Sequence, residues 1–320
     1  MTPRVGVVVI GRNEGERLRV CLGAIPFGAC NVVYVDSGST DGSLELAQRC
    51  GAFGVALDTT RGFTAGRARN AGLRALLAMA PHVEFVQFLD GDCEMDRDWL
   101  AKGLAFLWQN PRHAVVCGRV RERDPERSVF NRLCDWEWEV PVGEVKACGG
   151  NALVRVSAFR AVGGFHEQLI AGEEPELCLR LRQAGWGVHR LAGEMVLHDA
   201  AMTRFSQWWR RTTRTGHAFA EGAWLHGLER ERHWVRETLR AVFYGGLLPL
   251  AAVVLSATLA PWFLLLLLVY PALVLRLSRR QGGFTRAFYL VLGRFPEFLG
   301  VLKFVGTRLA QVPARLIEYK

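Results

Sequence analysis

Short apolar runs rich in β-branched residues alternate with longer helix-like stretches through the first part of the sequence, and this alternation constrains the fold more than any other feature. The apolar runs are Val5–Ile10, Val32–Val35, Val83–Leu89 and Val115–Val116, and the helix-like stretches lie near 14–24, 41–50, 64–79 and 96–108. Strands that alternate with helices of this length build right-handed βαβ units. The sequence therefore predicts an α/β fold with a Rossmann-like, mainly parallel sheet.

Polar residues follow three of these apolar runs directly. They are Arg12-Asn13-Glu14, the stretch 36–42 with the sequence DSGSTDG, and Asp90-Gly91-Asp92. Ligands of open α/β sheets bind at the carboxyl ends of the strands. We therefore expect the functional chemistry at these three positions.

The stretch 36–42 and the pair Asp90 and Asp92 each allow two interpretations. Residues 36–42 suit a nucleoside-binding loop, although Ser, Thr, Asp and Gly also make ordinary capped turns. If the strand stays extended through Asp92, residues 90 and 92 point the same way and converge on a hard divalent cation. A simple Asp-Gly turn is the alternative, and the two residues alone do not decide between them.

The order of several motifs is more specific than any one of them. VVVIGRNEGERLRVCLGAI, VVYVDSGSTDGSLELA, GRARNAG, FLDGDCEMD, GGNALVRVSAFRAVGGFHE and AGEEPELCLRLRQAGW follow one another along the chain. Residues 3–217 resemble the family 2 glycosyltransferases, which have the GT-A fold. The resemblance implies transfer of a sugar from a nucleotide-diphosphate-sugar donor to an acceptor hydroxyl or phosphate, in an inverting and metal-dependent reaction.

The resemblance also implies roles for individual residues on the donor side. Asp36 matches the aspartate that holds the nucleotide base, and Arg69 matches the arginine of the donor-side Arg-Asn motif. Asp90 and Asp92 match the two carboxylates that bind Mg²⁺ or Mn²⁺, with Asp92 as the main ligand. Arg12 stands where the family usually has an aromatic residue, and a guanidinium can also stack on a base.

A general base must accept the proton of the attacking hydroxyl, and the stretch EEPELCLRLRQAGW contains the candidates. Pro175 suits the first position of a helix that ends before Gly185, with Glu174 as its N-cap. The family has Glu-Asp where this chain has Glu173-Glu174, so the resemblance implies that Glu174 is the base. Glu173 is the alternative base, and both acids could instead only stabilise the helix dipole.

Two further elements have a functional and a structural interpretation. His198 follows an apolar run at the place where several GT-A enzymes have a third metal ligand, or it is a structural histidine. Arg210 and Arg211 belong to a stretch similar to the Gln-x-x-Arg element of processive family members, and could clamp the diphosphate. The adjacent Trp208 and Trp209 could instead form an interfacial aromatic belt.

Residues 241–275 contain no charged side chain, which predicts a membrane-embedded segment. A single helix of this length would extend about 52 Å, against a hydrocarbon core of about 30 Å. Pro249, Pro261 and Pro271 interrupt the stretch, and both flanks are rich in arginine. We therefore expect a hairpin that turns near Ala260–Pro261 or a re-entrant loop, with both flanks on the cytoplasmic face of the inner membrane. A buried helical pair is the alternative.

Residues 276–320 contain nine Lys or Arg and two Glu. We expect interfacial helices from about Phe284, with Phe288, Leu292, Phe295 and Phe298 in the headgroups and the arginines on anionic lipid. The expected domains are a catalytic domain at 1–225, an amphipathic linker at 226–240, the membrane segment at 241–276 and the basic tail at 277–320.

The remaining features exclude several classes of protein. The eight cysteines show no metal-ligand or disulfide spacing, which indicates reduced, mostly buried thiols. No dinucleotide or P-loop motif occurs, and no nucleic-acid recognition motif accompanies the basic tail.

We expect a lipid-linked or polyprenyl acceptor and a role in cell-surface polysaccharide or glycolipid synthesis. The alternative is a non-catalytic membrane scaffold or nucleotide-sugar-binding protein.

Overall fold

The chain forms two compact units in the computed structural model, which describes residues 4–58, 60, 62–280, 283–312 and 316–318. The first unit comprises residues 1–169 and 173–203, and the second comprises 170–172 and 204–320. The sequence-based expectation ends the catalytic domain at residue 225, whereas the compact units divide after Thr203. The long helix that follows Thr203 therefore groups with the C-terminal helices.

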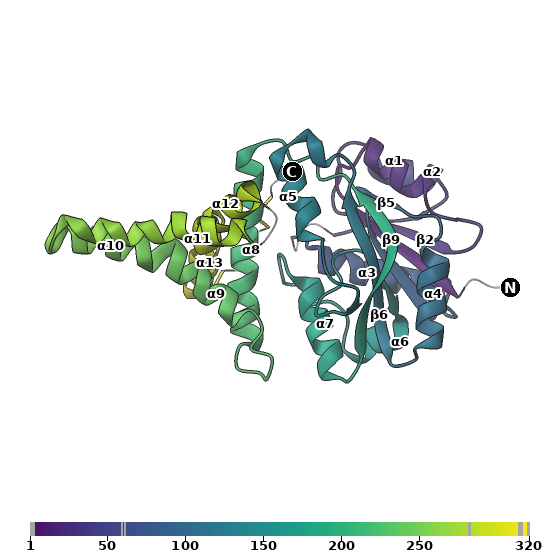
Figure 1. The fold of residues 1–320 in the computed structure, drawn as a ribbon. Coiled ribbons are helices and arrows are strands. Elements are labelled where there is room, and N and C mark those ends of the chain that lie inside the picture. The colour runs from purple at the N-terminus through teal and green to yellow at the C-terminus, as the bar shows by residue number, and fades with distance from the viewer. Residues whose placement is uncertain (1–3, 59, 61, 281–282, 313–315, 319–320) are drawn as a thin grey trace. The chain divides into compact units, whose positions relative to one another are not determined.

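The first unit is built on a nine-stranded mixed sheet in the order β3-β2-β1-β4-β8-β6-β9-β5, with β7 paired to β9 (Figure 1). The strands are β1 Val5–Gly11, β2 Asn31–Asp36, β3 Phe53–Ala56, β4 Phe85–Asp90, β5 Cys93–Met95, β6 His113–Glu122, β7 Gly143–Glu144, β8 Ala152–Arg155 and β9 Gly187–His198. Its helices are α1 Glu16–Gly23, α2 Ser43–Arg49, α3 Ala65–Met79, α4 Trp99–Gln109, η2 Pro125–Arg127, α5 Val129–Glu137, α6 Val156–Ala161 and α7 Glu173–Gln183.

The expected parallel sheet is confirmed for the N-terminal half of this unit. β1 pairs in parallel with both β2 and β4, and β2 pairs in parallel with β3. Beyond β4 the sheet becomes mixed, because β8 runs antiparallel to both β4 and β6. The sequence did not predict the short strands β3, β5 and β7, which are too brief to show an apolar period.

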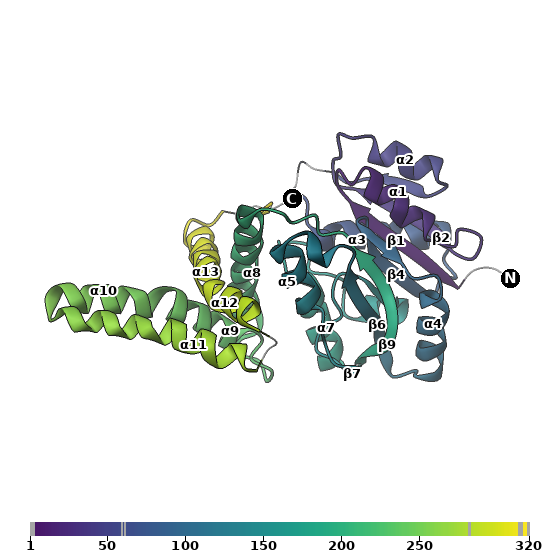
Figure 2. The ribbon, with the colours of Figure 1, turned by 45° about the horizontal axis from the view of Figure 1, so that its top comes forward.

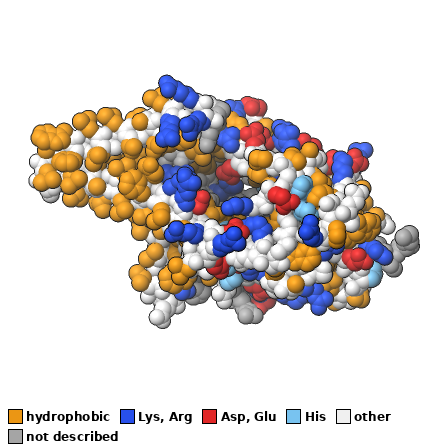
Figure 3. Space-filling view, turned by 60° about the horizontal axis from the view of Figure 1, so that its bottom comes forward, with side chains coloured by type: hydrophobic (Ala, Val, Ile, Leu, Met, Phe, Trp, Pro, Cys, Tyr) orange, Lys and Arg blue, Asp and Glu red, His pale blue; other side chains and the backbone are white. Residues whose placement is uncertain are grey.

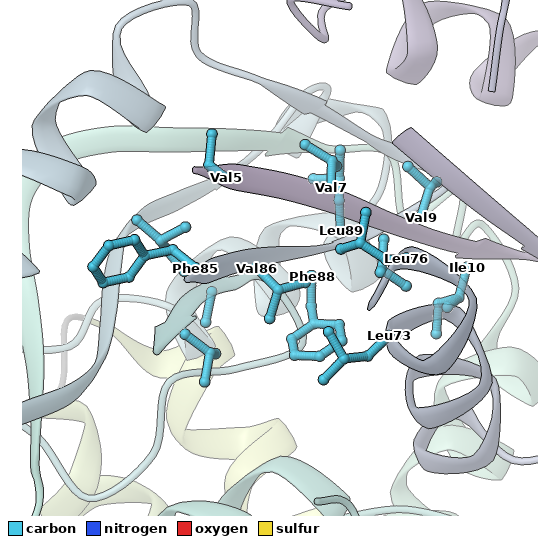
Figure 4. Packing of buried hydrophobic residues seen from close by; sticks show 14 of the residues in the cluster. Val5, Val7, Val9, Ile10, Leu73, Leu76, Phe85, Val86, Phe88 and Leu89 are labelled. Carbon is cyan, nitrogen blue, oxygen red and sulfur yellow. The ribbon is translucent and has the colours of Figure 1, made fainter. Parts of the chain in front are cut away.

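The core follows from the alternation of side chains along the strands. Val5, Val7 and Val9 project from one side of β1 (Figure 4), as the two-residue period of a strand requires. On the other side, Gly72 of α3 lies so close to the sheet that an added Cβ would come within 2.3 Å of Val8. A glycine is needed there because the helix backbone packs directly on the strand.

The second unit is helical (Figure 2). Its elements are α8 Phe205–His226, α9 Val235–Val242, the π-helical turn η3 Phe243–Leu247, α10 Leu248–Thr258, the 3₁₀ segment η4 Pro261–Leu268, α11 Val269–Ser278, α12 Phe284–Leu292 and α13 Arg294–Leu309. Helices α8 and α13 lie side by side, and glycines allow their close approach. An added Cβ on Gly216 would come within 2.0 Å of the Glu297 carbonyl oxygen, and one on Gly300 within 2.0 Å of the Thr213 carbonyl oxygen.

The uncharged stretch forms a two-helix arm, which we define as residues 248–278. Helix α10 packs against η4, and the chain reverses at Leu259 and Ala260, between these two elements. The chain therefore reverses at the place where the hairpin was expected to turn. Two helical runs, Val235–Thr258 and Pro261–Ser278, are long and apolar enough to cross a membrane, and only 22% and 6% of their most apolar windows are buried.

Hydrophobic side chains cover the surface of the arm (Figure 3). Exposed members include Leu250, Val253, Leu259, Trp262, Leu265 and Leu268. Basic side chains gather at its base (Figure 3). The arm is thus the least buried and most apolar part of the chain that the structure describes.

Helices α12 and α13 differ in part from the expected interfacial tail. Phe284 and Phe288 are exposed, as expected for residues that rest in headgroups. Phe295 instead packs on Tyr270 with a centroid distance of 5.4 Å, and the Phe298 ring fills the space that side chains at Gly245 and Gly246 would occupy. These two aromatic rings therefore stabilise the helical unit itself. Residues 281–282, 313–315 and 319–320 of the expected tail lie outside the described residues.

Candidate active site

The predicted ligand edge of the sheet is formed by the carboxyl ends of β1, β2 and β4. Asp36 at the end of β2 lies in register with Gly11 of β1, and Asp90 at the end of β4 lies in register with Ile10. Both aspartates therefore flank the end of the same strand. The short strand β5 continues from this edge and pairs Cys93 with His198 of β9.

Asp36 is buried and held by the loop that follows it. Its Oδ2 accepts backbone hydrogen bonds from Gly38 at 2.9 Å and Ser39 at 2.8 Å. The Tyr34 hydroxyl donates to Oδ1 at 3.2 Å. Burial and the neighbouring carboxylate raise the pKa of Tyr34, so its hydroxyl keeps its proton and donates. The carboxylate is thereby fixed at the edge of the sheet.

The loop after β1 is tied to the loop after β2. Asn13 has a positive φ of 55°. Its side-chain Oδ1 accepts a hydrogen bond from the Thr40 backbone N–H at 2.8 Å, and its backbone N–H donates to the Ser39 hydroxyl at 2.9 Å. Arg12 places its guanidinium 4.3 Å from the centre of the Phe63 ring. Arg12 therefore stacks on an aromatic ring of this chain, and its stacking on a nucleotide base stays a prediction.

Arg69 of α3 links two acidic residues that are far apart in the sequence. Its Nη2 donates to Asp90 Oδ1 at 2.7 Å and its Nη1 donates to Glu173 Oε1 at 2.7 Å. The guanidinium is 3% exposed and the Glu173 carboxylate is 7% exposed. Burial alone would lower the pKa of Arg69, but the carboxylates of Asp90 and Glu173 raise it above its ordinary value. The three groups form a charged network at the edge of the sheet.

Glu174 lies beside this network and is half-buried. Burial, and after it the charge of Glu173, raise the pKa of Glu174 to about 7. Helix α7 begins at Glu173, so both acids lie in its first turn and Glu174 is not the expected N-cap. Gly185 has a φ of +85° just beyond the last helical residue, which agrees with the predicted end of the helix.

Asp92 and His198 lie together on the other side of the edge. His198 Nε2 is 3.5 Å from Asp92 Oδ2, and His198 Nδ1 is 3.1 Å from Glu122 Oε2. Glu122 is buried and also accepts from the Asn131 side chain at 3.2 Å. A carboxylate that holds one ring nitrogen of a histidine directs the other nitrogen toward a metal. Asp92, Cys93 and His198 can jointly hold an ion.

Asp90 and Asp92 face different partners. The chain turns at residues 91 and 92 instead of staying extended, so the expected convergence through one continuous strand does not occur. Asp90 faces Arg69, and its backbone amide donates to Asn151 Oδ1 at 2.9 Å. Asp92 faces His198. The Asp-Gly turn, the second interpretation of this stretch, describes the backbone correctly.

The structure places Arg210 and Arg211 on α8, in the second unit. Arg210 lines a cavity of about 370 Å³ together with Trp209, Thr213, Leu299, Leu302, Lys303 and Ile317. Trp208 is buried and packs edge-on against Tyr289 at 5.0 Å. Trp208 is therefore a core residue of the helical unit in the described part of the chain.

Sequence reasoning missed two residues that position the site, Glu122 and Asn151. Glu122 ends a strand of which only Val115–Val116 was expected, and no sequence signal identifies it. Asn151 stands in the quoted GGN stretch, where a polar residue between two glycines and an apolar strand could have been noticed. Gly150 beside it is required, because an added Cβ would come within 2.6 Å of Asp90 Oδ2.

Comparison with known proteins identifies the family to which this chain belongs. A model of Glycosyl transferase family 2 matches residues 6–163. A model of Glycosyl transferase family group 2 matches residues 85–278, more than half of the chain. The chain belongs to the family 2 glycosyltransferases. This membership confirms the resemblance seen in the ordered motifs.

Two curated relatives share part of their length with this family 2 glycosyltransferase. Glycosyltransferase AglE of Haloferax volcanii is 26% identical over 206 residues, which cover 58% of this chain and 64% of the relative. Pre-mycofactocin glycosyltransferase of Mycobacterium tuberculosis is 30% identical over 236 residues, which cover 69% of this chain and 48% of the relative. The chain thus spans less than two thirds of either protein.

A solved structure supports the GT-A fold. The mannosyltransferase PcManGT from Pyrobaculum calidifontis, in complex with GDP-Man and Mn²⁺, aligns with a TM-score of 0.66 at 20% identity. The alignment covers 95% of this family 2 glycosyltransferase and 88% of PcManGT. At this identity the likeness establishes the fold, and the predicted fold class is confirmed.

Proposed function

We propose that the chain is a metal-dependent, inverting glycosyltransferase that moves a sugar from a nucleotide-diphosphate-sugar donor to a hydroxyl or phosphate of a lipid-linked acceptor. The observation that carries this proposal is the pair of hydrogen bonds from the buried Arg69 guanidinium to Asp90 and Glu173. These bonds occupy Glu173 and leave Glu174, whose pKa is raised to about 7, as the base of the site.

The donor is bound at the carboxyl ends of β1, β2 and β4. Asp36, fixed by two backbone amides, accepts hydrogen bonds from the nucleotide base. Arg12 covers the base as it covers the Phe63 ring. Arg69 and Asp90 face the diphosphate and sugar. The assignment of Arg210 and Arg211 to the diphosphate stays a prediction from the sequence.

The residues around Asp92 fit a divalent cation. Asp92 would supply a carboxylate oxygen, and Glu122 holds His198 Nδ1 so that Nε2 is directed toward Asp92, where it would ligate the ion. An imidazole in the set favours Mn²⁺ over the harder Mg²⁺. When bound, the cation neutralises the charge that develops on the leaving nucleoside diphosphate. Asp92 and His198 would hold this cation at the edge of the sheet.

Glu174 accepts the proton of the acceptor hydroxyl as that oxygen attacks the sugar carbon. A base with a pKa close to neutral combines a large unprotonated fraction with a strong tendency to accept the proton. Because Glu173 is hydrogen-bonded to Arg69, it is not available as a second, nucleophilic carboxylate. A single displacement with one base inverts the configuration of the sugar carbon.

The acceptor side of the proposal rests on the apolar arm. Its exposed leucines and valines would lie in a bilayer, and the basic residues at its base would contact anionic lipid on the cytoplasmic face. Lipid-linked acceptors occupy the same surface. An enzyme held there would act on such an acceptor in cell-surface polysaccharide or glycolipid synthesis.

A donor screen with membrane fractions tests the proposal. Membranes that contain the protein are incubated with labelled nucleotide sugars and Mn²⁺, and label is counted in the lipid pool extracted by organic solvent. We expect one donor to label this pool in the wild type and no donor to do so with Glu174→Gln. Equal labelling by both proteins would contradict the proposal.

The same screen distinguishes a non-catalytic nucleotide-sugar-binding protein, which is the alternative. Such a protein would retain the labelled donor on filters but release no nucleoside diphosphate. The raised pKa of Glu174 favours the enzyme, because a binding protein has no use for a carboxyl group that titrates near neutral pH.

A further inference from the structure

A second cluster of metal-ligating side chains lies at the end of the sheet opposite to the candidate active site. It consists of His113, Glu144 and His189, whose ligand atoms all lie within 4.8 Å of one another. We propose that these three residues form a zinc site that is separate from the catalytic cation and fastens strand β7 to β6 and β9.

The two clusters lie at opposite ends of the same pair of strands. His113 begins the ten-residue strand β6 and Glu122 ends it, while β9 contains His189 near its start and His198 at its end. At about 3.3 Å per residue, the nine steps from His113 to Glu122 extend about 30 Å. The proposed zinc site therefore shares no ligand with Asp92 and His198, and the two can be tested independently.

Both imidazoles aim a ring nitrogen at the same carboxylate oxygen. His113 Nε2 lies 2.6 Å from Glu144 Oε1, and His189 Nδ1 lies 3.3 Å from the same atom. A tetrahedral zinc ion with bonds of about 2.0–2.1 Å holds its ligand atoms about 3.3 Å apart. The His189–Glu144 distance already has this value, and the His113–Glu144 distance must open by about 0.7 Å.

Glu144 can make this adjustment because its side chain is 64% exposed, so its rotamers are open. The two rings are held more firmly. Phe106 of α4 stacks on His189 with a centroid distance of 4.5 Å and contacts His113 edge-on at 5.2 Å. Gly187 leaves room for the His113 ring, because an added Cβ would come within 2.5 Å of His113 Cδ2. Two fixed imidazoles and one mobile carboxylate suit zinc with an open fourth position.

The expected effect of the ion is local. Strand β7 has only two residues, paired with β9 at Glu144–His189 and Gly143–Arg190, so its own backbone hydrogen bonds hold it weakly. Zinc would add a cross-link between three strands at this point. The segment that follows β7 leads to Gly150 and Asn151, which contact Asp90, so the cross-link would also restrain the back of the donor site.

The test uses the full chain in detergent, purified with a tag that contains no histidine, stripped with chelator and titrated with ZnCl₂. Asp92→Asn with His198→Gln removes the candidate catalytic ligands. In this background we expect one bound zinc ion per chain. Adding Glu144→Gln or His189→Gln should weaken zinc binding by at least about 100-fold, since even an outer-shell change costs 10–100-fold. The exposed residue His82 is the control, and His82→Gln should leave the affinity unchanged.

Two further measurements keep the test decisive if the combined variant does not fold. With CoCl₂, the otherwise wild-type chain should show visible d–d absorption that Glu144→Gln reduces, and Glu144 is exposed enough for its replacement to leave the fold intact. Zinc should also slow amide hydrogen exchange in residues 143–151, and Glu144→Gln should abolish this slowing. Absence of zinc binding in the folded background variant, or binding and exchange that Glu144→Gln and His189→Gln leave unchanged, would overturn the proposal.

Discussion

Arg69 donates a hydrogen bond of 2.7 Å to Glu173, a residue 104 positions further along the chain. This contact separates the roles of two adjacent acids in the first turn of α7. Glu173 is one partner of a buried guanidinium, whereas the half-buried Glu174 next to it has a pKa raised to about 7. The sequence left both acids open as the base, and the contact favours Glu174.

The first prediction concerns these two acids. Glu174→Gln keeps the size of the side chain but cannot accept a proton, so transfer should fall by about 10²–10⁴-fold while donor binding persists. Glu173→Gln should lower transfer less and instead destabilise the protein by about 1–3 kcal/mol, because Arg69 loses one of its charged partners. Single-turnover rates, donor affinity and thermal midpoints measure the two effects. If the two variants exchange these phenotypes, Glu173 is the base.

The second prediction concerns pH. Glu174 must be unprotonated to act as a base, and its pKa is raised to about 7 by burial and by Glu173. The value of kcat/KM should therefore rise about tenfold per pH unit below pH 7 and level off above it. Rate profiles at saturating Mn²⁺ check this, and Glu174→Gln is the control. A profile of the same shape in that variant would assign the titration to another group.

The third prediction concerns the buried carboxylate behind His198. Glu122→Gln keeps a hydrogen-bond acceptor but removes the charge that fixes the His198 ring at 3.1 Å. The affinity for Mn²⁺ should fall about 10–100-fold, with activity restored at high Mn²⁺ concentration. Glu94→Gln, on strand β5 on the other side of β9, is a matched control because Glu94 pairs with Arg123. A Glu122→Gln enzyme with unchanged Mn²⁺ dependence would contradict the metal assignment.

The fourth prediction concerns the crossing of α8 and α13. Gly216→Ala would place a Cβ 2.0 Å from a backbone oxygen of α13, so the helices must separate, and the protein should lose about 3 kcal/mol of unfolding free energy. Gly306, also on α13, has no atom within 4 Å of an added Cβ. Gly306→Ala should instead stabilise by about 0.5–1 kcal/mol. Thermal midpoints of the two variants should shift in opposite directions, and equal shifts would contradict the packing.

The fifth prediction concerns the arm. The two apolar helical runs that contain the arm, Val235–Thr258 and Pro261–Ser278, extend about 36 Å and about 27 Å, close to the hydrocarbon core of about 30 Å. A cysteine introduced at Leu259 should react with an impermeant reagent from outside intact spheroplasts, whereas one at Arg279 should react only after lysis. A cysteine at Arg279 that reacts from outside would place the base of the arm on the wrong side.

Patterns within short stretches of sequence were enough to predict several strands and the chain reversal near Ala260. The strands β1, β2 and β4 were visible because each is buried on both faces and reads as a continuous apolar run. The chain reversal near Ala260 was predictable for two reasons. A single helix over the whole uncharged stretch would be longer than the hydrocarbon core is thick, and a proline interrupts the stretch at this point. The candidate site residues Asp36, Arg69, Asp90 and Asp92 follow from strand ends and ordered motifs.

Long-range contacts were not predictable in the same way. The pairing of Arg69 with Glu173 depends on α7 lying beside α3, and no local period encodes that placement. Glu122 becomes part of the site only because β6 and β9 run in parallel and bring it to His198. The turn at Gly91 and Asp92 was one of two backbones compatible with the sequence, and the inward orientation of Phe298 depends on two glycines 52 and 53 residues earlier.

The central claim, metal-dependent transfer from a nucleotide sugar, is tested most directly by the release of nucleoside diphosphate. Purified protein is supplied with the donor identified by the screen and with lipid extract as acceptor, and release is followed with Mn²⁺, with chelator, and with Asp92→Asn. We predict release by the wild type with Mn²⁺, at least about 100-fold less after chelation, and a comparable loss with folded Asp92→Asn. Release that persists at the wild-type rate in both conditions would contradict the claim.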